Sequence, residues 1–294
     1  MAADRAALSA SPLRRNAVLC ASPSGLHRLA YVEWGDPGNP RVLVCVHGLT
    51  RCARDFDRLA RSLADRYRVV CPDMPGRGES DWLRNPMDYA TPAYLNSVVT
   101  LIARLGVATV DWVGTSMGGL IGMALASLDK TPIRRLVLNE AGPLVMAQAL
   151  DRIGTYVGKA PPFPDFDAAL RYVRAVSAPF GPHTDDEWRF LTEHVVRRQP
   201  DGTFRVHYDP AIAVPFDAQA PHQDLELWRV WDAIGCPTLV IRGELSDLLA
   251  RATVERMKTT GPLAEAVEFA GVGHAPTLMH DDQIAVVREF LLRG

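Results

Sequence analysis

The feature that most constrains the fold of this chain is a regular alternation of mainly apolar runs with segments of helical periodicity. The apolar runs have the length of strands, and parallel strands read this way when both faces of their sheet are covered. The predicted strands span residues 41–48, 67–73, 109–115, 133–140, 236–243 and 265–271, and the predicted helices span residues 54–65, 91–106, 117–128, 250–258 and 281–292. This alternation predicts an α/β protein with a mostly parallel sheet between two layers of helices.

Two regions depart from the alternation. Strand-like runs on both sides of residues 22–25 predict a β-hairpin near the N-terminus, preceded by a flexible tail over residues 1–16. Residues 141–232 are expected to be mainly helical, with capping-box spacing from Thr184 to Glu187. This insert carries more than half of the aromatic residues. We expect most of them to fill its own core and a few to wall an apolar pocket at the carboxyl edge of the sheet.

Composition and charge exclude several classes of protein. The 294 residues are 48% hydrophobic and 22% charged, with a formal net charge of −2 and no basic stripe, which argues against nucleic acid as a partner. The five cysteines show no CxxC or metal-binding spacing, which indicates a reducing compartment. Residues 112–128 are uncharged but contain four glycines, so a buried strand and helix explain them better than a membrane span. The sequence therefore predicts a cytoplasmic protein without a membrane partner.

A serine lies in the pattern G-x-S-x-G between a predicted strand and a predicted helix. Gly114 and Gly118 flank Ser116 at the two outer positions of the pattern. A serine on so sharp a turn adopts a strained backbone, and larger flanking residues would collide with it. The turn presents the hydroxyl above the sheet at the positive end of the helix. We therefore expect Ser116 to be a nucleophile rather than a small residue in a packing contact.

A serine hydroxyl is a weak nucleophile unless a base takes its proton and an anion orients that base. His274 follows the last predicted strand and so lies at the same edge of the sheet as Ser116, whereas the histidines of the insert suit surface or capping roles. For the anion, Asp247 and Glu244 follow the strand 236–243. Asp247 is the preferred choice because it lies further into the loop and can reach over the edge of the sheet.

The order Ser116, Asp247, His274 matches that of the α/β-hydrolases, and from about residue 17 onward the chain resembles that family. The resemblance rests on the segments CVHGLT, DMPGRGES, GTSMGG, GELSDLL and GVGHAP, which occur in the family's order. It implies an eight-stranded, mostly parallel sheet flanked by helices. It also implies a core made of residues 17–140 and 233–294, with residues 141–232 inserted after the sixth strand as a helical cap.

The segment after the first apolar run fits an oxyanion hole, which needs preorganised N–H donors. The expected donors are the backbone N–H groups of Met117 and Leu49. Gly48 lets the backbone approach the serine, and His47 is expected to brace the loop rather than to react. Neither a metal nor an organic cofactor is expected.

These residues predict a serine hydrolase that cleaves carboxylic esters or lactones of small to medium apolar substrates through an acyl-enzyme. Ser116 argues against the haloalkane dehalogenases and epoxide hydrolases of the family, which use an aspartate at that position. Carbon–carbon hydrolases of ring-cleavage products stay an alternative, although Ala275 stands where they typically carry an aromatic residue. A ligand-binding protein with little turnover and an acyl transferase are further alternatives.

Overall fold

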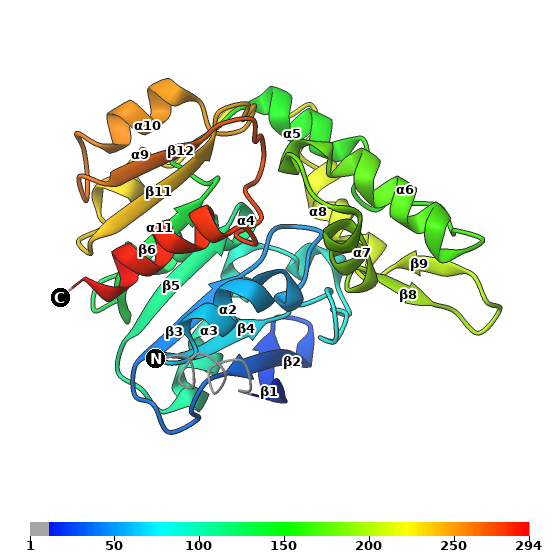
Figure 1. The fold of residues 1–294 in the computed structure, drawn as a ribbon, viewed down its shortest axis with the longest axis horizontal. Coiled ribbons are helices and arrows are strands. Elements are labelled where there is room, and N and C mark those ends of the chain that lie inside the picture. The colour runs from blue at the N-terminus through cyan, green and yellow to red at the C-terminus, as the bar shows by residue number, and fades with distance from the viewer. Residues whose placement is uncertain (1–11, 294) are drawn as a thin grey trace.

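An eight-stranded sheet forms the centre of the molecule in the computed structural model, which describes residues 12–293 (Figure 1). The strands are β1 (Arg14–Ser22), β2 (Gly25–Trp34), β3 (Val42–Val46), β4 (Arg68–Pro72), β5 (Val110–Thr115), β6 (Ile133–Asn139), β11 (Thr238–Gly243) and β12 (Glu265–Phe269). Their order is β1-β2-β4-β3-β5-β6-β11-β12. The pairs β1–β2 and β2–β4 are antiparallel and all others are parallel. The predicted fold class is confirmed.

Helices cover both faces of this sheet, because alternate side chains of the central strands point to opposite layers. Val42, Val44 and Val46 of β3 pack into one hydrophobic core, and Leu43 and Cys45 pack into the other. The first core is covered by α3 (Thr91–Leu105), α4 (Met117–Ala126) and α10 (Arg251–Met257). The second is covered by α2 (Asp57–Leu63) and α11 (Asp281–Leu292), which lie in front of the sheet in Figure 1.

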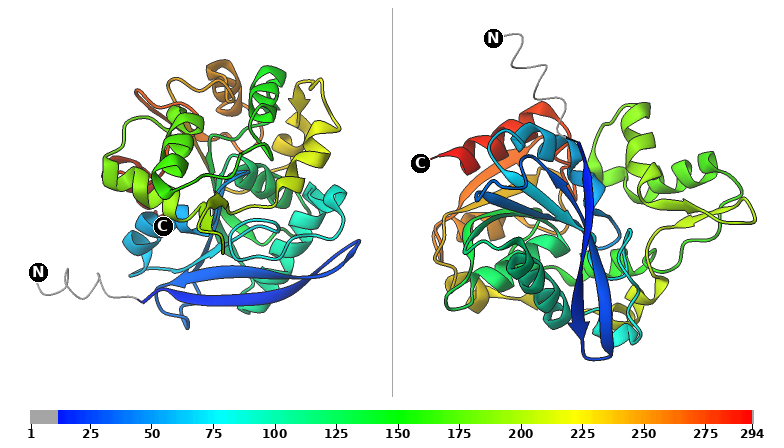
Figure 2. Two further views of the ribbon diagram at one scale, coloured as in Figure 1. Left: turned by 90° about the vertical axis from the view of Figure 1, so that its right-hand side faces the viewer. Right: turned by 90° about the horizontal axis from the view of Figure 1, so that it is seen from below.

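We call residues 141–232 the cap segment, keeping the predicted boundaries as a proposal. Between β6 and β11 the chain forms β7 (Leu144–Val145), α5 (Ala147–Gly154), α6 (Phe166–Val176), α7 (Asp185–Glu193), β8 (Val196–Arg198), β9 (Phe204–Val206), α8 (Ala213–Asp217), β10 (Leu225–Glu226) and α9 (Trp228–Asp232). Figure 2 shows much of this segment projecting beyond the sheet. The expected capping box of Thr184 and Glu187 is present. The two-stranded sheets β7–β10 and β8–β9 were not predicted, because strands of two or three residues carry too little periodicity.

The N-terminal hairpin begins earlier than its sequence pattern indicates. Residues 1–11 of the predicted tail lie outside the described residues, but residues 14–16 belong to β1. Arg14 pairs in register with Glu33, and its Nη2 donates to the carbonyl oxygen of Gly35 at 2.7 Å. The polar residues 14–16 hid the start of the strand, because they precede its apolar run and lie on an exposed edge of the sheet.

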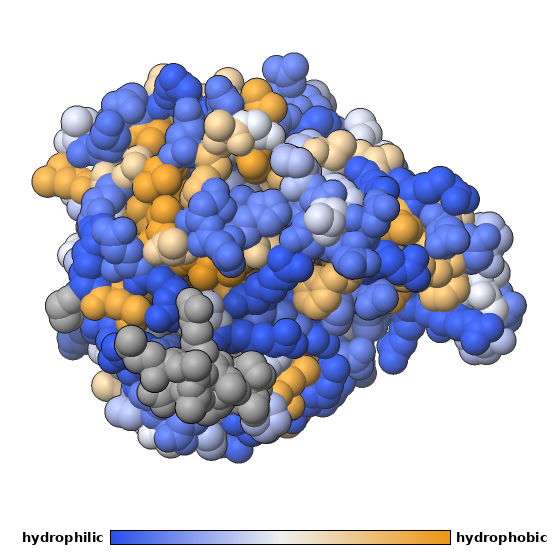
Figure 3. Space-filling model, in the orientation of Figure 1, coloured by the Kyte–Doolittle hydropathy of each residue, from blue (hydrophilic) through white to orange (hydrophobic). Residues whose placement is uncertain are grey.

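None of the helices described over residues 12–293 is long and apolar enough to cross a membrane. The uncharged stretch at residues 112–128 divides into most of β5 and the whole of α4, as predicted. On the face seen in Figure 3, hydrophilic residues predominate over the cap segment, with apolar residues between them.

Candidate active site

Ser116 occupies a sharp turn between β5 and α4. Its backbone φ is +50°, in the region that side-chain-bearing residues rarely adopt. A Cβ on Gly118 would lie 2.0 Å from the carbonyl oxygen of Val46, and one on Gly114 would lie 2.2 Å from that of Gly118. The two flanking glycines therefore let α4 start directly against the strands, which holds the serine at the carboxyl edge of the sheet.

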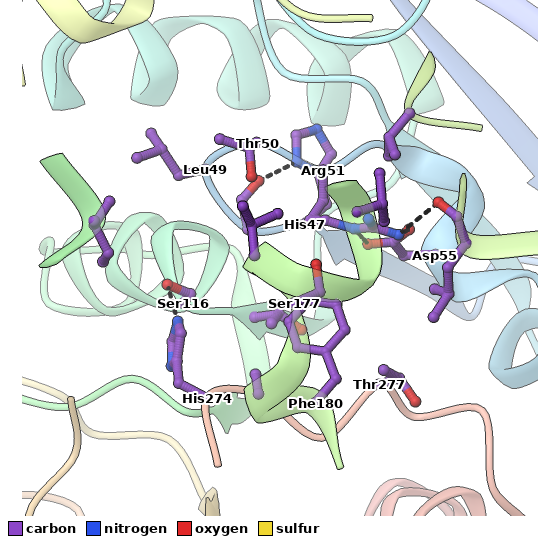
Figure 4. Close-up of a pocket in the computed structure, with 18 of the residues that line it drawn as sticks. His47, Leu49, Thr50, Arg51, Asp55, Ser116, Ser177, Phe180, His274 and Thr277 are labelled. Atoms are coloured by element: carbon purple, nitrogen blue, oxygen red, sulfur yellow. Dashed lines mark hydrogen bonds and ion pairs between the residues drawn. The ribbon is translucent and has the colours of Figure 1, made fainter. Parts of the chain in front are cut away.

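His274 reaches the same edge from the loop after β12. Its Nε2 lies 3.0 Å from Oγ of Ser116, and Figure 4 shows the two side chains facing each other from different segments. This distance is a hydrogen bond, so the imidazole is placed to accept the hydroxyl proton. The structure thus brings together two of the three residues that the sequence predicted as a triad.

The carboxylate beside His274 is Glu140, which directly follows β6. Its Oε2 lies 3.1 Å from Nδ1 of His274, and its side chain is fully buried. The same oxygen accepts from Oγ of Ser246 at 2.5 Å, and Oε1 accepts from the N–H of Gly243 at 2.6 Å. These donors compensate for the loss of water around the buried charge. Glu140 therefore occupies the position of an orienting acid.

The structure does not bring Asp247 to His274, which corrects the predicted pairing. Asp247 instead points outward and binds Arg152, with contacts of 2.5 and 3.0 Å from Nε and Nη2. Glu244, the alternative acid, accepts from the N–H of Gly271 at 2.9 Å. The loop after β11 turns Ser246 inward, and Ser246 reaches His274 only through Glu140.

One signal in the sequence pointed to Glu140. It is the last residue of the predicted strand at 133–140 and follows the apolar residues 136–138, so it is a charged side chain where a parallel strand ends. The carboxyl ends of parallel strands meet at one edge of the sheet, which here also carries Ser116. The prediction favoured Asp247 because it lies further into the loop after residues 236–243, and the chain order of the α/β-hydrolases agreed with that choice.

The loop after β3 approaches the serine closely. A Cβ on Gly48 would lie 3.7 Å from Cβ of Ser116, and the N–H of Arg51 donates to the carbonyl oxygen of Gly48 at 3.2 Å. Within residues 12–293, the N–H groups of Leu49 and Met117 have no hydrogen-bond partner. Two N–H donors beside the nucleophile are thus available to an oxyanion.

His47 connects this loop to the neighbouring strand. Its Nε2 accepts from the N–H of Met74 at 2.9 Å, so Nδ1 carries the proton and donates to the carbonyl oxygen of Gly48 at 2.7 Å. Burial lowers the pKa of His47 to about 4. The imidazole is therefore neutral at pH 7 and braces the loop without facing the serine.

A cavity of about 100 Å³ opens above Ser116 and His274. The cap segment contributes most of its aromatic wall, namely Tyr156, Tyr172, Phe180 and Tyr208. Phe180 lies on the far side of the cavity from Leu49 in Figure 4. The lining is largely apolar with few charged groups, which suits an uncharged small-molecule segment next to the serine.

In the part of the chain that the structure describes, no cluster of three or more His, Cys, Asp or Glu side chains is arranged to hold a metal ion. The cavity presents the hydroxyl of Ser116 and the imidazole of His274, with the buried carboxylate of Glu140 behind the imidazole and free N–H donors beside the hydroxyl, which are the groups that acyl transfer needs.

Comparison with known proteins agrees with this arrangement. The family model described as "Alpha/beta hydrolase family" matches residues 43–289. A 3-hydroxybutyrate-oligomer hydrolase of Cupriavidus necator is 51% identical over 96% of this chain and 99% of its own length. A crystal structure of a putative hydrolase from Rickettsia typhi superimposes with a TM-score of 0.88 at 34% identity, over 95% of this chain and 98% of that one. An α/β hydrolase from Novosphingobium aromaticivorans gives a TM-score of 0.85 at 36% identity, over 96% and 99%. The chain therefore belongs to the alpha/beta hydrolase family and is an ester-bond hydrolase.

Proposed function

We propose that the protein is a serine esterase whose triad is Ser116, His274 and Glu140. The observation that carries this proposal is the continuous hydrogen-bonded chain from the Ser116 hydroxyl through both nitrogens of His274 to a buried carboxylate. Nucleophile, base and orienting anion are each within hydrogen-bond distance of the next, as the chemistry requires.

In the first half of the reaction, Oγ of Ser116 attacks the ester carbonyl while Nε2 of His274 accepts its proton. Glu140 keeps the proton on Nδ1 and stabilises the imidazolium. The N–H groups of Leu49 and Met117 hold the oxyanion of the tetrahedral intermediate. His274 then protonates the departing alkoxide, and an acyl-enzyme forms on Ser116. Water activated by His274 releases the acid by the reverse sequence.

For the substrate, we propose the ester bonds of short 3-hydroxybutyrate oligomers. The Cupriavidus relative is named as a hydrolase of 3-hydroxybutyrate oligomers, and it matches this chain across nearly its whole length. Each unit of such an oligomer presents a methyl group and one ester, which suits a small apolar cavity over a serine. The cap segment supplies most of that wall, so we assign it the role of a lid that shapes the pocket. Lactones share the same acyl chemistry and are tested alongside.

The predicted cytoplasmic location stays a prediction. All five cysteines have free thiols, and four of them are buried, which is compatible with a reducing compartment.

The test compares wild type with Ser116→Ala on the 3-hydroxybutyrate dimer, on p-nitrophenyl esters from acetate to decanoate and on a lactone. We expect hydrolysis of the dimer and of the short esters by wild type, and none by the variant at unchanged thermal stability. Mass spectrometry of wild type during turnover should detect an acyl group on the Ser116 peptide. Turnover that persists in the variant would refute the serine mechanism, and a wild type that ignores the dimer would refute the substrate.

A further inference from the structure

Two arginines line the cavity, Arg51 and Arg152, and each forms an ion pair with an aspartate. The two pairs differ in how exposed they are to solvent. Arg51 binds Asp55 through Nε and Nη2, each at 2.7 Å, and Nη2 also donates to the carbonyl oxygen of Leu191 at 3.1 Å. The side chains of this first pair are only 10% and 19% exposed. Opening it would leave a buried charge without its partner, at a cost of several kcal/mol. The first pair is therefore a fixed part of the wall.

The second pair joins the cap segment to the core. Arg152 on α5 binds Asp247 in the loop after β11, and their side chains are 35% and 47% exposed. Among residues 12–293, Asp247 has no other hydrogen-bond partner. A pair this exposed contributes little to stability, because water solvates both groups once they separate. Arg152 can therefore exchange Asp247 for another carboxylate at little cost.

This second pair lies next to the reacting groups. Arg152 lines the same cavity as Ser116 and His274. Asp247 directly follows Ser246, whose hydroxyl binds Glu140. Of the two arginines that line the cavity within the described residues, Arg152 is the one whose carboxylate partner is easily displaced. Its planar fork matches the two oxygens of a carboxylate.

We propose that Arg152 binds the free terminal carboxylate of the substrate in place of Asp247, so that the enzyme prefers hydroxyacid oligomers with an unesterified end. The inference rests on the proposed function, because every linear hydroxyacid oligomer carries a carboxylate at one end. Asp247 acts as the resident competitor, which neutralises Arg152 while the site is empty and turns toward solvent when substrate enters.

This exchange predicts opposite effects for the two halves of the pair. Loss of the Arg152 charge removes the anchor, whereas loss of the Asp247 charge removes its competitor. A pair that serves only to hold cap and core together would respond alike to both changes, whatever charge the substrate carries.

The experiment measures kcat/KM for the 3-hydroxybutyrate dimer as the free acid and as its methyl ester. Both substrates contain the same internal ester, but the methyl ester carries a second cleavable ester. Cleavage of the internal bond is therefore measured by the initial release of 3-hydroxybutyrate from the free acid and of methyl 3-hydroxybutyrate from the methyl ester, so that the ratio reports recognition of the carboxylate. We expect Arg152→Gln to lower the ratio of free acid to methyl ester roughly 10-fold or more, the worth of a charge-assisted hydrogen bond. Asp247→Asn should raise the same ratio several-fold.

The matched control is Arg174→Gln. Arg174 also lies in the cap segment and pairs with Asp185, with an exposed fraction of 37% that is close to that of Arg152, but it does not line the cavity. Its ratio should equal that of wild type. Equal ratios in all four proteins, or a lower ratio in Asp247→Asn, would overturn the inference while leaving the esterase proposal intact. A wild type that cleaves neither dimer would refute the proposed function itself.

Discussion

Replacing Glu140 with glutamine changes one heavy atom and tests whether Glu140, rather than Asp247, is the acid that orients His274. In the native site Oε1 accepts from Gly243, and Oε2 accepts from both Ser246 and His274. An amide supplies only one oxygen for these two positions. One orientation of the amide places its NH₂ against the N–H of Gly243, so that two donors face each other inside the protein.

The other orientation places the NH₂ against Nδ1 of His274. The imidazole must then accept at Nδ1 and carry its proton on Nε2, 3.0 Å from Oγ of Ser116. That tautomer donates to the serine and cannot take its proton. Glutamine thus either disrupts the buried contacts or disables the base, in both cases without creating a cavity.

Amide substitution of the acid in a serine triad lowers kcat by about 10⁴. We expect a loss of roughly 10³–10⁴ for Glu140→Gln, which corresponds to about 4–5 kcal/mol in the activation free energy. Asp247→Asn should stay within about 3-fold of wild type on an uncharged ester, because its carboxylate belongs to an exposed ion pair away from His274.

The assay is the steady-state hydrolysis of p-nitrophenyl butyrate by wild type and both variants, with circular dichroism and thermal unfolding as folding controls. A folded Glu140→Gln that keeps more than about a tenth of the wild-type kcat would refute the assignment of Glu140. A loss in Asp247→Asn as large as that in Glu140→Gln would return the acid role to Asp247.

Three further predictions concern the support of the site. Ser246→Ala should lower kcat about 10-fold with little change in KM, because it removes a hydrogen bond that positions Glu140 and touches no substrate. His47→Gln should change the pH dependence of stability. In wild type the unfolded chain binds a proton on His47 below about pH 6.5, whereas the native state binds it only below about pH 4. The free energy of unfolding of wild type therefore decreases as the pH is lowered from 6.5 toward 4. When the pH is lowered from 7.5 to 5, the free energy of unfolding of the variant, measured with urea, should rise by about 2 kcal/mol relative to that of wild type. The same pH dependence in both proteins would contradict a buried neutral imidazole. Gly118→Ala would force a Cβ against a carbonyl oxygen of β3 at 2.0 Å. It should cost at least about 2 kcal/mol of unfolding free energy, whereas Gly235→Ala, which meets open space, should change stability by less than about 0.5 kcal/mol.

The order of strands and helices was readable from the sequence because it depends on local patterns. Buried parallel strands require apolar side chains on both faces, and this requirement produced the mainly apolar runs that became β3, β4, β5, β6 and β11. The same reasoning located Ser116, since only a turn between such a strand and a helix needs glycines on both sides. It located His274 because the last loop returns to the same edge of the sheet.

The identity of the acid depended on tertiary structure. Glu140 and Asp247 both follow parallel strands, so both lie at the edge that carries the serine. Which carboxylate meets Nδ1 of His274 is decided by the path of the loop after β11, which turns Ser246 inward and Asp247 outward. A loop path results from many contacts between distant segments, and no periodicity in the chain encodes it.

The sequence by itself thus determined the sheet and the placement of Ser116 and His274, the proposed nucleophile and base, because each follows from a pattern of neighbouring residues and from the edge at which parallel strands end. Tertiary structure alone decided which carboxylate lies beside His274, the aromatic wall from the cap segment and the pairing of Arg152 with Asp247. These features join distant segments of the chain. The contact of Glu140 with His274 forms only when the loop after β12 packs beside the end of β6, and the other two form only once the cap segment has packed against the core.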